Sequence, residues 1–183
     1  EYAYAYQRMW VFQDDTYLYF TAPTDIQKKI MVTIFLNGDG LQFIDLKPQG
    51  VKINAEYFLH NIIQKLENLD VTNAAKKQKQ TMLLHYDNAP SHNANMVTNY
   101  LIKTTFRKVP HPPYSPDLAI CDFGVFGTAK NYMQGKRFGT EEALLSELNK
   151  FFREKPKEFY FSLFESWIER LHKCIDIGGD YVE

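Results

Sequence analysis

Two aspartates stand at positions from which carboxylates can do chemistry. Asp87 follows the apolar run 81–86 (TMLLHY), and Asp122 follows the proline-containing stretch 111–120 (HPPYSPDLAI). Converging carboxylates offer oxygen ligands, which Mg²⁺ prefers while it keeps positions open for substrate phosphates. Paired ions about 3.5–4 Å apart activate an attacking oxygen and stabilise the leaving oxygen in phosphodiester cleavage. With a third acid from a neighbouring strand, Asp87 and Asp122 would form such a site.

Three polar residues around Asp87 are candidates to support its carboxylate. His85 lies two residues earlier, so strand alternation places it on the same sheet face. His85 would then support Asp87 as a neighbouring side chain that does not itself bind the metal, or it is a core histidine whose hydrogen bonds are satisfied within the protein. Asn88 and His92 would orient Asp87 or contact phosphate, and a role in starting the next helix explains them nearly as well. Asp87 itself has an alternative role, because a strand-end carboxylate often caps a helix or binds loop amides.

The first fifty residues are typical of a β-sheet. Aromatic and β-branched residues predict strands over 2–12, 16–22, 29–36 and 41–46. The sequence NGDG at 37–40 predicts the turn of a hairpin. Asp14 and Asp15 fall between the first two of these strands, in a predicted turn.

The rest of the chain alternates between helix and strand and then becomes helical. Asn54 predicts the cap of a helix that runs to about Leu69. Further segments are predicted as follows: a polar connector at 73–80, a strand at 81–86, a helix at 91–103, a strand at 106–110, an irregular proline loop at 111–120, and helices from Cys121, Thr140 and Pro156. This order favours an α/β fold in which helices flank a mixed sheet. In such sheets functional groups collect at the carboxyl ends of strands, where Asp87 lies.

Composition sets outer limits on function. The 183 residues fit one domain, and 45% apolar residues exclude a disordered chain. The net charge of −1 argues against a generally basic nucleic-acid protein. Locally, residues 101–137 hold six Lys and Arg against two Asp, whereas residues 138–183 hold ten acids against six bases. A basic middle suits a polyanion on one face, and an evenly solvated surface explains it as well. Two cysteines make no disulfide framework, and no apolar run approaches the roughly 18 residues that span a membrane.

Three separated segments together resemble one family. They are LKPQGVKINAEYF at 46–58, HYDNAPSH at 85–92 and HPPYSPDLAICDF at 111–123. Their sequence, their order and the 34 residues between Asp87 and Asp122 resemble the catalytic domain of mariner-type transposases. The resemblance implies an RNase H-like fold, a single catalytic domain over residues 1–183, and metal-dependent DNA cleavage and strand transfer in cut-and-paste transposition.

By this resemblance Asp87 and Asp122 are the catalytic and metal-binding residues, and Mg²⁺ (or Mn²⁺) is the cofactor. Asp117 is a competing acid that the family pattern assigns to the loop, and Tyr114 shapes that loop. The implied partners are transposon-end and target DNA, with a homodimer in the full-length protein, acting in the nucleus.

The chain also departs from the family pattern. The family's first catalytic Asp precedes a Glu on the first strand, and this chain starts at Glu1, as if cut just after that Asp. We therefore expect the first catalytic Asp and the helix-turn-helix DNA-binding domains to be absent here. Gly124 stands where the family usually has His. The alternative function is an inactive transposase-derived relic that binds DNA or dimerises; a non-transposase RNase H-like nuclease is a more distant reading.

Overall fold

A five-stranded mixed sheet forms the centre of the computed structural model, which describes the chain except residues 1–8, 22–26, 48–49 and 79. The strand order is β3-β2-β1-β4-β5. The strands are β1 (Met9–Thr21), β2 (Gln27–Asn37), β3 (Gly40–Leu46), β4 (Met82–Tyr86) and β5 (Phe106–Val109). The first three pair antiparallel, whereas β4 runs parallel to both β1 and β5. The predicted mixed α/β sheet is therefore confirmed.

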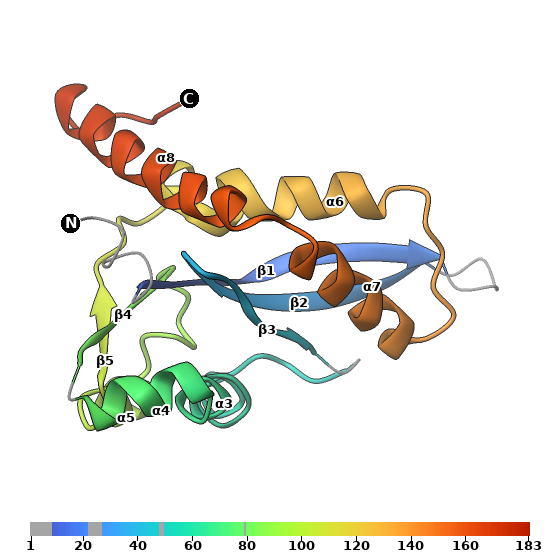
Figure 1. Cartoon of the computed structure of the whole chain (residues 1–183), viewed down its shortest axis with the longest axis horizontal. Coiled ribbons are helices and arrows are strands. Elements are labelled where there is room, and N and C mark those ends of the chain that lie inside the picture. Colours follow the sequence, from blue (N-terminus) through green and yellow to red (C-terminus); the bar gives the residue numbers. More distant parts are fainter. Residues whose placement is uncertain (1–8, 22–26, 48–49, 79) are drawn as a thin grey trace.

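Helices cover both faces of this sheet. Those on one face are α2 (Ala55–Tyr57), the π-helical turn η1 (Phe58–Ile63), α3 (Gln64–Glu67), α4 (Asp70–Lys77) and α5 (Asn95–Leu101). Those after β5 are the 3₁₀ turn η2 (Pro116–Leu118), the π-helical turn η3 (Cys121–Phe126), α6 (Gly127–Met133), α7 (Glu141–Arg153) and α8 (Lys157–Asp176). Figure 1 shows α3, α4 and α5 below the sheet and α6 and α8 above it, while α7 overlaps the strands in this view.

Each face of the sheet has its own core because side chains alternate along the strands. On β2, Ile34 and Leu36 pack with the residues of α6, α7 and α8, while Phe35 between them packs with η1 and α5. On β4, Leu84 and Tyr86 belong to the core under η1 and α5. Asp87, which follows β4, is thus held at a strand end that is anchored by two buried side chains.

The two strands predicted on either side of Asp14 and Asp15 are one strand in the structure. β1 runs without interruption from Met9 to Thr21, so the expected turn at these acids is wrong. The register with β2 shifts between Gln13 and Thr16, where β1 carries one extra residue. Such a β-bulge breaks side-chain alternation without ending a strand, which is why the sequence pattern looked like two strands. The predicted β-structure before residue 9 lies outside the described residues.

The expected polar connector at 73–80 is also wrong in part, because α4 extends to Lys77. Thr72 and Ala75 are buried and supply the inner face of this short helix. The predicted helix cap at Asn54 is confirmed, since its Oδ1 accepts the Tyr57 N–H at 2.8 Å. The NGDG turn joins β2 to β3 as predicted.

The helix expected over 91–103 is shorter in the structure, where α5 starts at Asn95 and ends at Leu101. In the described part of the chain, none of the helices combines the length and the apolar character that crossing a membrane requires.

Candidate active site

Asp87 is fixed by two hydrogen bonds that both reach the same oxygen. Its Oδ1 accepts the Ala89 N–H at 3.1 Å and Nδ1 of His92 at 2.6 Å. A carboxylate only accepts, so Nδ1 of His92 carries the proton in this pair. The His92 side chain is fully buried, whereas the Asp87 side chain is 22% exposed. The carboxylate is therefore oriented from inside the protein, and Oδ2 keeps no described hydrogen-bond partner, as suits a metal ligand.

The same contacts set the protonation of Asp87. Burial by itself would raise the pKa of this carboxyl. The hydrogen bonds from His92 and the Ala89 N–H, with the nearby His92 and His111 rings, outweigh burial and lower the pKa of Asp87 below its usual range. Asp87 is thus a carboxylate at neutral pH. The contact from His92 agrees with the prediction that this residue orients Asp87.

Asn88 supports the site in a different way from the one predicted. Its Nδ2 donates to the His111 carbonyl at 2.6 Å, and its Oδ1 accepts from Lys108 Nζ at 3.2 Å. Lys108 also donates to Asn93 Oδ1 at 2.5 Å and lies 4.7 Å from the centre of the Tyr86 ring. Asn88 therefore ties the Asp87 segment to the end of β5 and to the proline loop, and neither of these two bonds reaches Asp87 itself.

His85 is buried, as the core interpretation expected, and it also contacts the site. Its Nε2 lies 3.2 Å from Nδ1 of His111, and its ring packs on Trp167 at a centroid distance of 4.9 Å. Burial, followed by the His111 and Lys108 charges, lowers the pKa of His85 to about 3, so the ring is neutral. His85 thus acts on the site through His111.

The sequence analysis missed His111 and Lys108. His111 is half-buried; burial lowers its pKa, as does Lys108, while Asp87 and Asp117 act in the opposite direction. Burial also lowers the pKa of Lys108, against the attraction of Asp87. His111 opens the motif HPPYSPDL, so its position in that motif was the available signal. Nothing in the local sequence distinguished Lys108 from a solvated lysine.

Asp122 is carried on a helix start that two buried neighbours anchor. Ile120 and Cys121 are fully buried in the core beneath α8, while Asp122 remains partly exposed. Its backbone N–H donates to the Ala119 carbonyl at 2.9 Å. The helix that the sequence predicted near Cys121 is confirmed as η3 followed by α6.

The proline loop before Asp122 is fastened to α8 and to the C-terminal segment. The Trp167 indole N–H donates to the Leu118 carbonyl at 2.8 Å. Asp117 is buried, and its Oδ2 accepts the Val182 N–H at 2.9 Å. Arg170 donates to the carbonyls of Asp117 and Val182 at 3.3 and 3.0 Å. These contacts agree with the assignment of Asp117 to the loop and not to the metal site.

Asp87 and Asp122 line one cleft of about 580 Å³. The other residues around it come from the segment after β4 and from the proline loop: Asn88, Ala89, Pro90, His111, Pro112, Pro113, Tyr114, Ser115 and Pro116. Tyr114 has a positive φ of 54° and a fully exposed side chain, so it shapes the loop as expected without packing against it. The two predicted carboxylates therefore face a common space.

The departure at Gly124 has a structural explanation. A Cβ atom at this position would lie 2.4 Å from Cδ2 of Leu163, on α8. A histidine, as usually found here in the family, needs Leu163 to move away. In this chain α8 instead packs directly on η3, close to Asp122.

Asp14 and Asp15 lie beside Asp87 in the strand register. β1 pairs in parallel with β4, and Phe12 is opposite Tyr86. Continuing this register puts Gln13 opposite Asp87, so the two acids come one and two residues later, at the bulge. β4 ends at Tyr86 while β1 continues to Thr21, so the two acids lie on the part of β1 that follows its pairing with β4, next to the strand end that carries Asp87.

The donor set at this edge suits a hard divalent cation. Carboxylate oxygens are available from Asp87 and Asp122 on one cleft, with the acids of β1 next in the register. Among the side chains that the structure describes, which do not include those of β1, no three His, Cys, Asp or Glu residues come together as a metal site.

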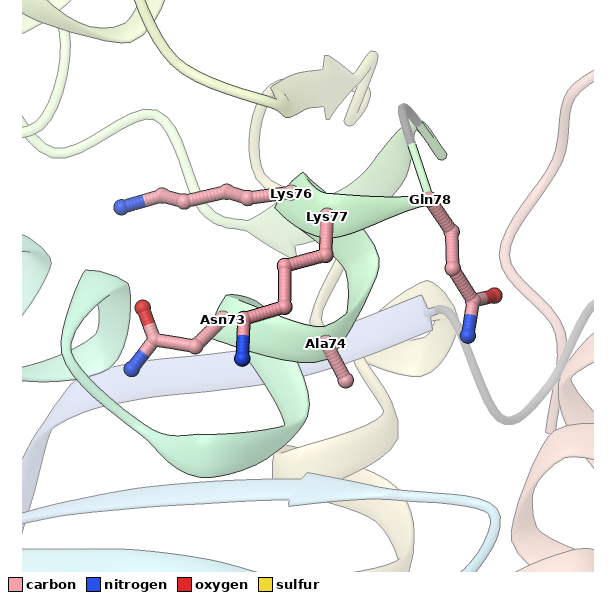
Figure 2. Close-up of a pocket in the computed structure, with 5 residues that line it drawn as sticks. All are labelled: Asn73, Ala74, Lys76, Lys77 and Gln78. Carbon is pink, nitrogen blue, oxygen red and sulfur yellow. The ribbon is translucent and has the colours of Figure 1, made fainter.

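A second hollow, on α4, has a different chemistry. It has a volume of about 710 Å³ and is lined by Asn73, Ala74, Lys76, Lys77 and Gln78. Figure 2 shows these side chains, with two lysines and no acid among them. Lys76 forms an ion pair with Glu67 at 2.8 Å. The residues that line this hollow include no carboxylate, whereas two carboxylates line the other cleft, so the cleft of Asp87 and Asp122 is the candidate active site.

Comparison with known proteins gives one family. A family described as Transposase (partial DDE domain) matches residues 4–83. Histone-lysine N-methyltransferase SETMAR of Homo sapiens is 33% identical over 177 residues, which is 95% of this chain and 25% of that protein. The Mariner Mos1 transposase of Drosophila mauritiana is 30% identical over 163 residues, which is 88% of this chain and 47% of that protein. The chain thus spans a quarter and about half of these relatives.

Solved structures agree with the sequence relatives. The crystal structure of the catalytic domain of Mos1 mariner transposase superposes with a TM-score of 0.86 at 28% identity, covering 97% of this chain and 85% of that one. Structures of that domain with Raltegravir and Mn or Mg give a TM-score of 0.85 at 26% identity, covering 97% and 86%. A Mos1 paired-end complex with the left transposon end gives 0.82 at 25% identity, covering 97% and 57%. The sheet order, the spacing of Asp87 and Asp122 and these matches identify the chain as a catalytic domain of the mariner transposase type.

Proposed function

We propose that this chain cleaves DNA strands and transfers them, as the catalytic domain of a cut-and-paste transposase that depends on a divalent cation. The observation that carries the proposal is the shared cleft, which is lined both by Asp87, whose carboxylate His92 orients, and by Asp122. The Mos1 catalytic domain has been solved with Mn and with Mg, which supports Mg²⁺ or Mn²⁺ as the cation here. The inactive relic is not favoured, because both carboxylates are in place.

We further propose that Asp14 supplies the third carboxylate. The sequence analysis expected this acid upstream of Glu1, where no described residue tests it. The strand register supports a position inside the chain instead. If the pairing of β1 with β4 is continued by one residue, Gln13 comes opposite Asp87, and Asp14 is the next residue after Gln13. The matched family segment, residues 4–83, includes both Asp14 and Asp15. Asp15 lies one residue further from Asp87 along β1 and serves as the control.

The side chains of this cleft would each have a separate task. Asp87 offers Oδ2 to the cation while His92 holds Oδ1, so the carboxylate cannot rotate away. Asp122 would supply the second carboxylate, from a helix start whose preceding loop is fastened to the core by the bond from Trp167 to the Leu118 carbonyl. The cation, when bound, polarises the scissile phosphate and lowers the pKa of the attacking water or 3′-hydroxyl. Positioning by fixed groups is a large share of such catalysis.

DNA is the proposed partner, as a transposon end and as a target. The Mos1 structure with a left transposon end supports this class of ligand. Lys108, beside the cleft, adds positive charge next to Asn88 and Asn93. Binding by such contacts runs through the phosphate backbone and weakens as salt rises. A homodimer and a nuclear location are proposed for the full-length protein on the resemblance alone.

A nicking assay on supercoiled plasmid with Mg²⁺ or Mn²⁺ tests these proposals. We expect metal-dependent nicking that falls to background in Asp87→Asn, Asp122→Asn and Asp14→Asn, whereas Asp15→Asn keeps most of it. Removing one carboxylate leaves the cation loosely held and the attacking oxygen misaligned. The reaction then loses both activation by the metal ion and correct positioning of the reacting groups. Thermal melts in chelator show whether each variant is folded.

The outcomes separate the two proposals. Nicking by Asp87→Asn at the wild-type rate would remove the case for this cleft as the active site. Wild-type nicking by Asp14→Asn, with loss in Asp15→Asn, would move the third ligand by one residue. If the wild-type chain is inert and a version extended upstream of Glu1 is active, the third acid lies upstream, as the sequence alone suggested.

A further inference from the structure

The buried ring of His85 poses a question of proton placement. Its Nδ1 is buried and forms no hydrogen bond with the described part of the chain. Its Nε2 faces Nδ1 of His111 at 3.2 Å. Between two neutral imidazoles one nitrogen must donate and the other must accept, so the tautomers of the two rings are linked.

The nitrogen without a partner, Nδ1 of His85, indicates which of the two rings donates the hydrogen bond between them. If Nδ1 of His85 carried the proton, a buried N–H would be left without an acceptor, an arrangement that is rarer in folded proteins than an unused lone pair. Trp167, which packs on this ring at 4.9 Å, offers at most a weak N–H···π contact. The proton therefore resides on Nε2 of His85, which donates to Nδ1 of His111.

The hydrogen bond from His85 fixes the tautomer of His111, the residue of this pair that lines the cleft. Because Nδ1 of His111 accepts, its remaining proton sits on Nε2, the ring nitrogen for which the structure gives no partner among the described residues. Asn88 holds the same residue by its backbone carbonyl at 2.6 Å, so ring and backbone are both anchored. We infer that His111 is a catalytic residue that donates a hydrogen bond from Nε2 to a non-bridging oxygen of the scissile phosphate.

The inference rests on the proposed function and adds a residue to it. His111 lines the same cleft as Asp87 and Asp122, so a phosphate bound in that cleft would share its space with His111. A neutral donor stabilises charge that develops on the phosphoryl oxygens. Burial lowers the pKa of His111, which agrees with a neutral ring.

Nuclear magnetic resonance tests the tautomers without requiring activity. The chain has five histidines, so two-bond ¹⁵N–¹H spectra of the rings can be assigned with single substitutions. We expect the proton of both His85 and His111 on Nε2. In His85→Phe the His111 ring loses its donor and should show mixed tautomers. A proton on Nδ1 of His111 in the wild-type protein would overturn the inference.

Three substitutions at His111 test the donor itself. The amide nitrogen of His111→Gln reaches the place of Nε2, that of His111→Asn reaches only the place of Nδ1, and His111→Phe has no donor. We expect His111→Gln to retain a nicking rate within a few-fold of the wild-type rate. Asn and Phe should lose about 100-fold in the rate at saturating DNA, the size seen when one donor to a developing oxyanion is removed. Equal rates in Gln and Phe would refute a donor role.

The failure of this inference differs from a failure of the proposed function. If Asp87→Asn abolishes nicking and His111→Phe does not, only the role of His111 falls. If the wild-type chain does not nick at all, a short DNA duplex titrated in Ca²⁺ decides. Displacement of the His111 Nε2–H resonance by that duplex supports the contact, and an unchanged resonance refutes it.

Discussion

Replacing Asp117 by Ala should unfasten the loop that carries Asp122. The carboxylate of Asp117 accepts the Val182 N–H at 2.9 Å, and Val182 is only 1% exposed. A hydrogen bond to a charged group contributes about 1.5–3 kcal/mol, and a buried N–H left without acceptor costs about 1–3 kcal/mol. The two figures describe partly the same loss and are not simply added, so we expect Asp117→Ala to lower the free energy of unfolding by about 3 kcal/mol. Asp117→Asn keeps an acceptor oxygen and should lose about half as much.

Urea unfolding followed by circular dichroism measures this effect. With a slope of about 2–3 kcal/mol per molar urea, the Ala variant should shift the midpoint down by about 1–1.5 M at an unchanged slope. Nicking by the folded fraction of both variants should remain metal-dependent. The reason is that Asp117 is not among the residues that line the cleft shared by Asp87 and Asp122. It lines a neighbouring hollow of about 240 Å³, which Asp122 and Val182 also line, and its carboxylate there accepts the Val182 N–H.

Two results would refute this reasoning. A loss below about 0.5 kcal/mol in Asp117→Ala would show that the contact with Val182 does not hold the segment, since the expected size follows from burial of both partners. Abolished nicking in a fully stable Asp117→Asn would make this residue a ligand of the cation, and the assignment of Asp117 to the loop would be wrong.

Further predictions concern Glu67, Gly124 and ionic strength. Burial raises the pKa of Glu67, but hydrogen bonds from Lys76 and Tyr100 outweigh it and lower the pKa below the ordinary 4.5. The stability it contributes is therefore present above pH 4.5 and is lost as pH falls through the folded-state pKa, so Glu67→Gln should flatten unfolding free energy against pH in this acid range. Gly124→Ala should destabilise by about 1 kcal/mol, because crowding of Leu163 exceeds the helix-propensity gain, and the cost should shrink in a Leu163→Ala background. DNA affinity of the wild-type chain in a filter-binding assay should fall steeply between low and moderate salt; a flat response would contradict backbone-driven binding.

The main elements and two site residues were predictable because they rest on local rules. Asn54 and Thr140 both cap helices in the structure, as their residue types and spacing predicted. Asp87 and Asp122 line one cleft, as their positions at a strand end and a helix start indicated. The two caps need only short-range hydrogen bonding, and the strand end and the helix start follow from backbone periodicity, whereas the shared cleft joins residues 35 positions apart.

The prediction failed where side-chain alternation was interrupted or reversed. At Asp14 and Asp15 a β-bulge inserts one residue into β1, so two segments of alternating pattern look like two strands. Whether a strand continues through such a break depends on its partner, here β2, which pairs with both halves. The residues of β2 that pair on either side of the bulge, Ile34 and Val32, lie 21 and 16 positions from their partners Gln13 and Thr16, and a local pattern cannot reveal this pairing.

The sequence by itself determined most of the strands and helices, the candidate carboxylates Asp87 and Asp122, and the family that their spacing resembles; it did not reveal that β1 is one strand or that α4 is a helix. Only the tertiary structure decided that Asp14 and Asp15 lie at the edge of Asp87, that His111 meets His85, and that Asp117 binds Val182. The physical reason is the range of the interactions. Caps and alternation act over a few residues, whereas the His85–His111 and Asp117–Val182 contacts join residues 26 and 65 positions apart and exist only once the sheet and α8 have packed.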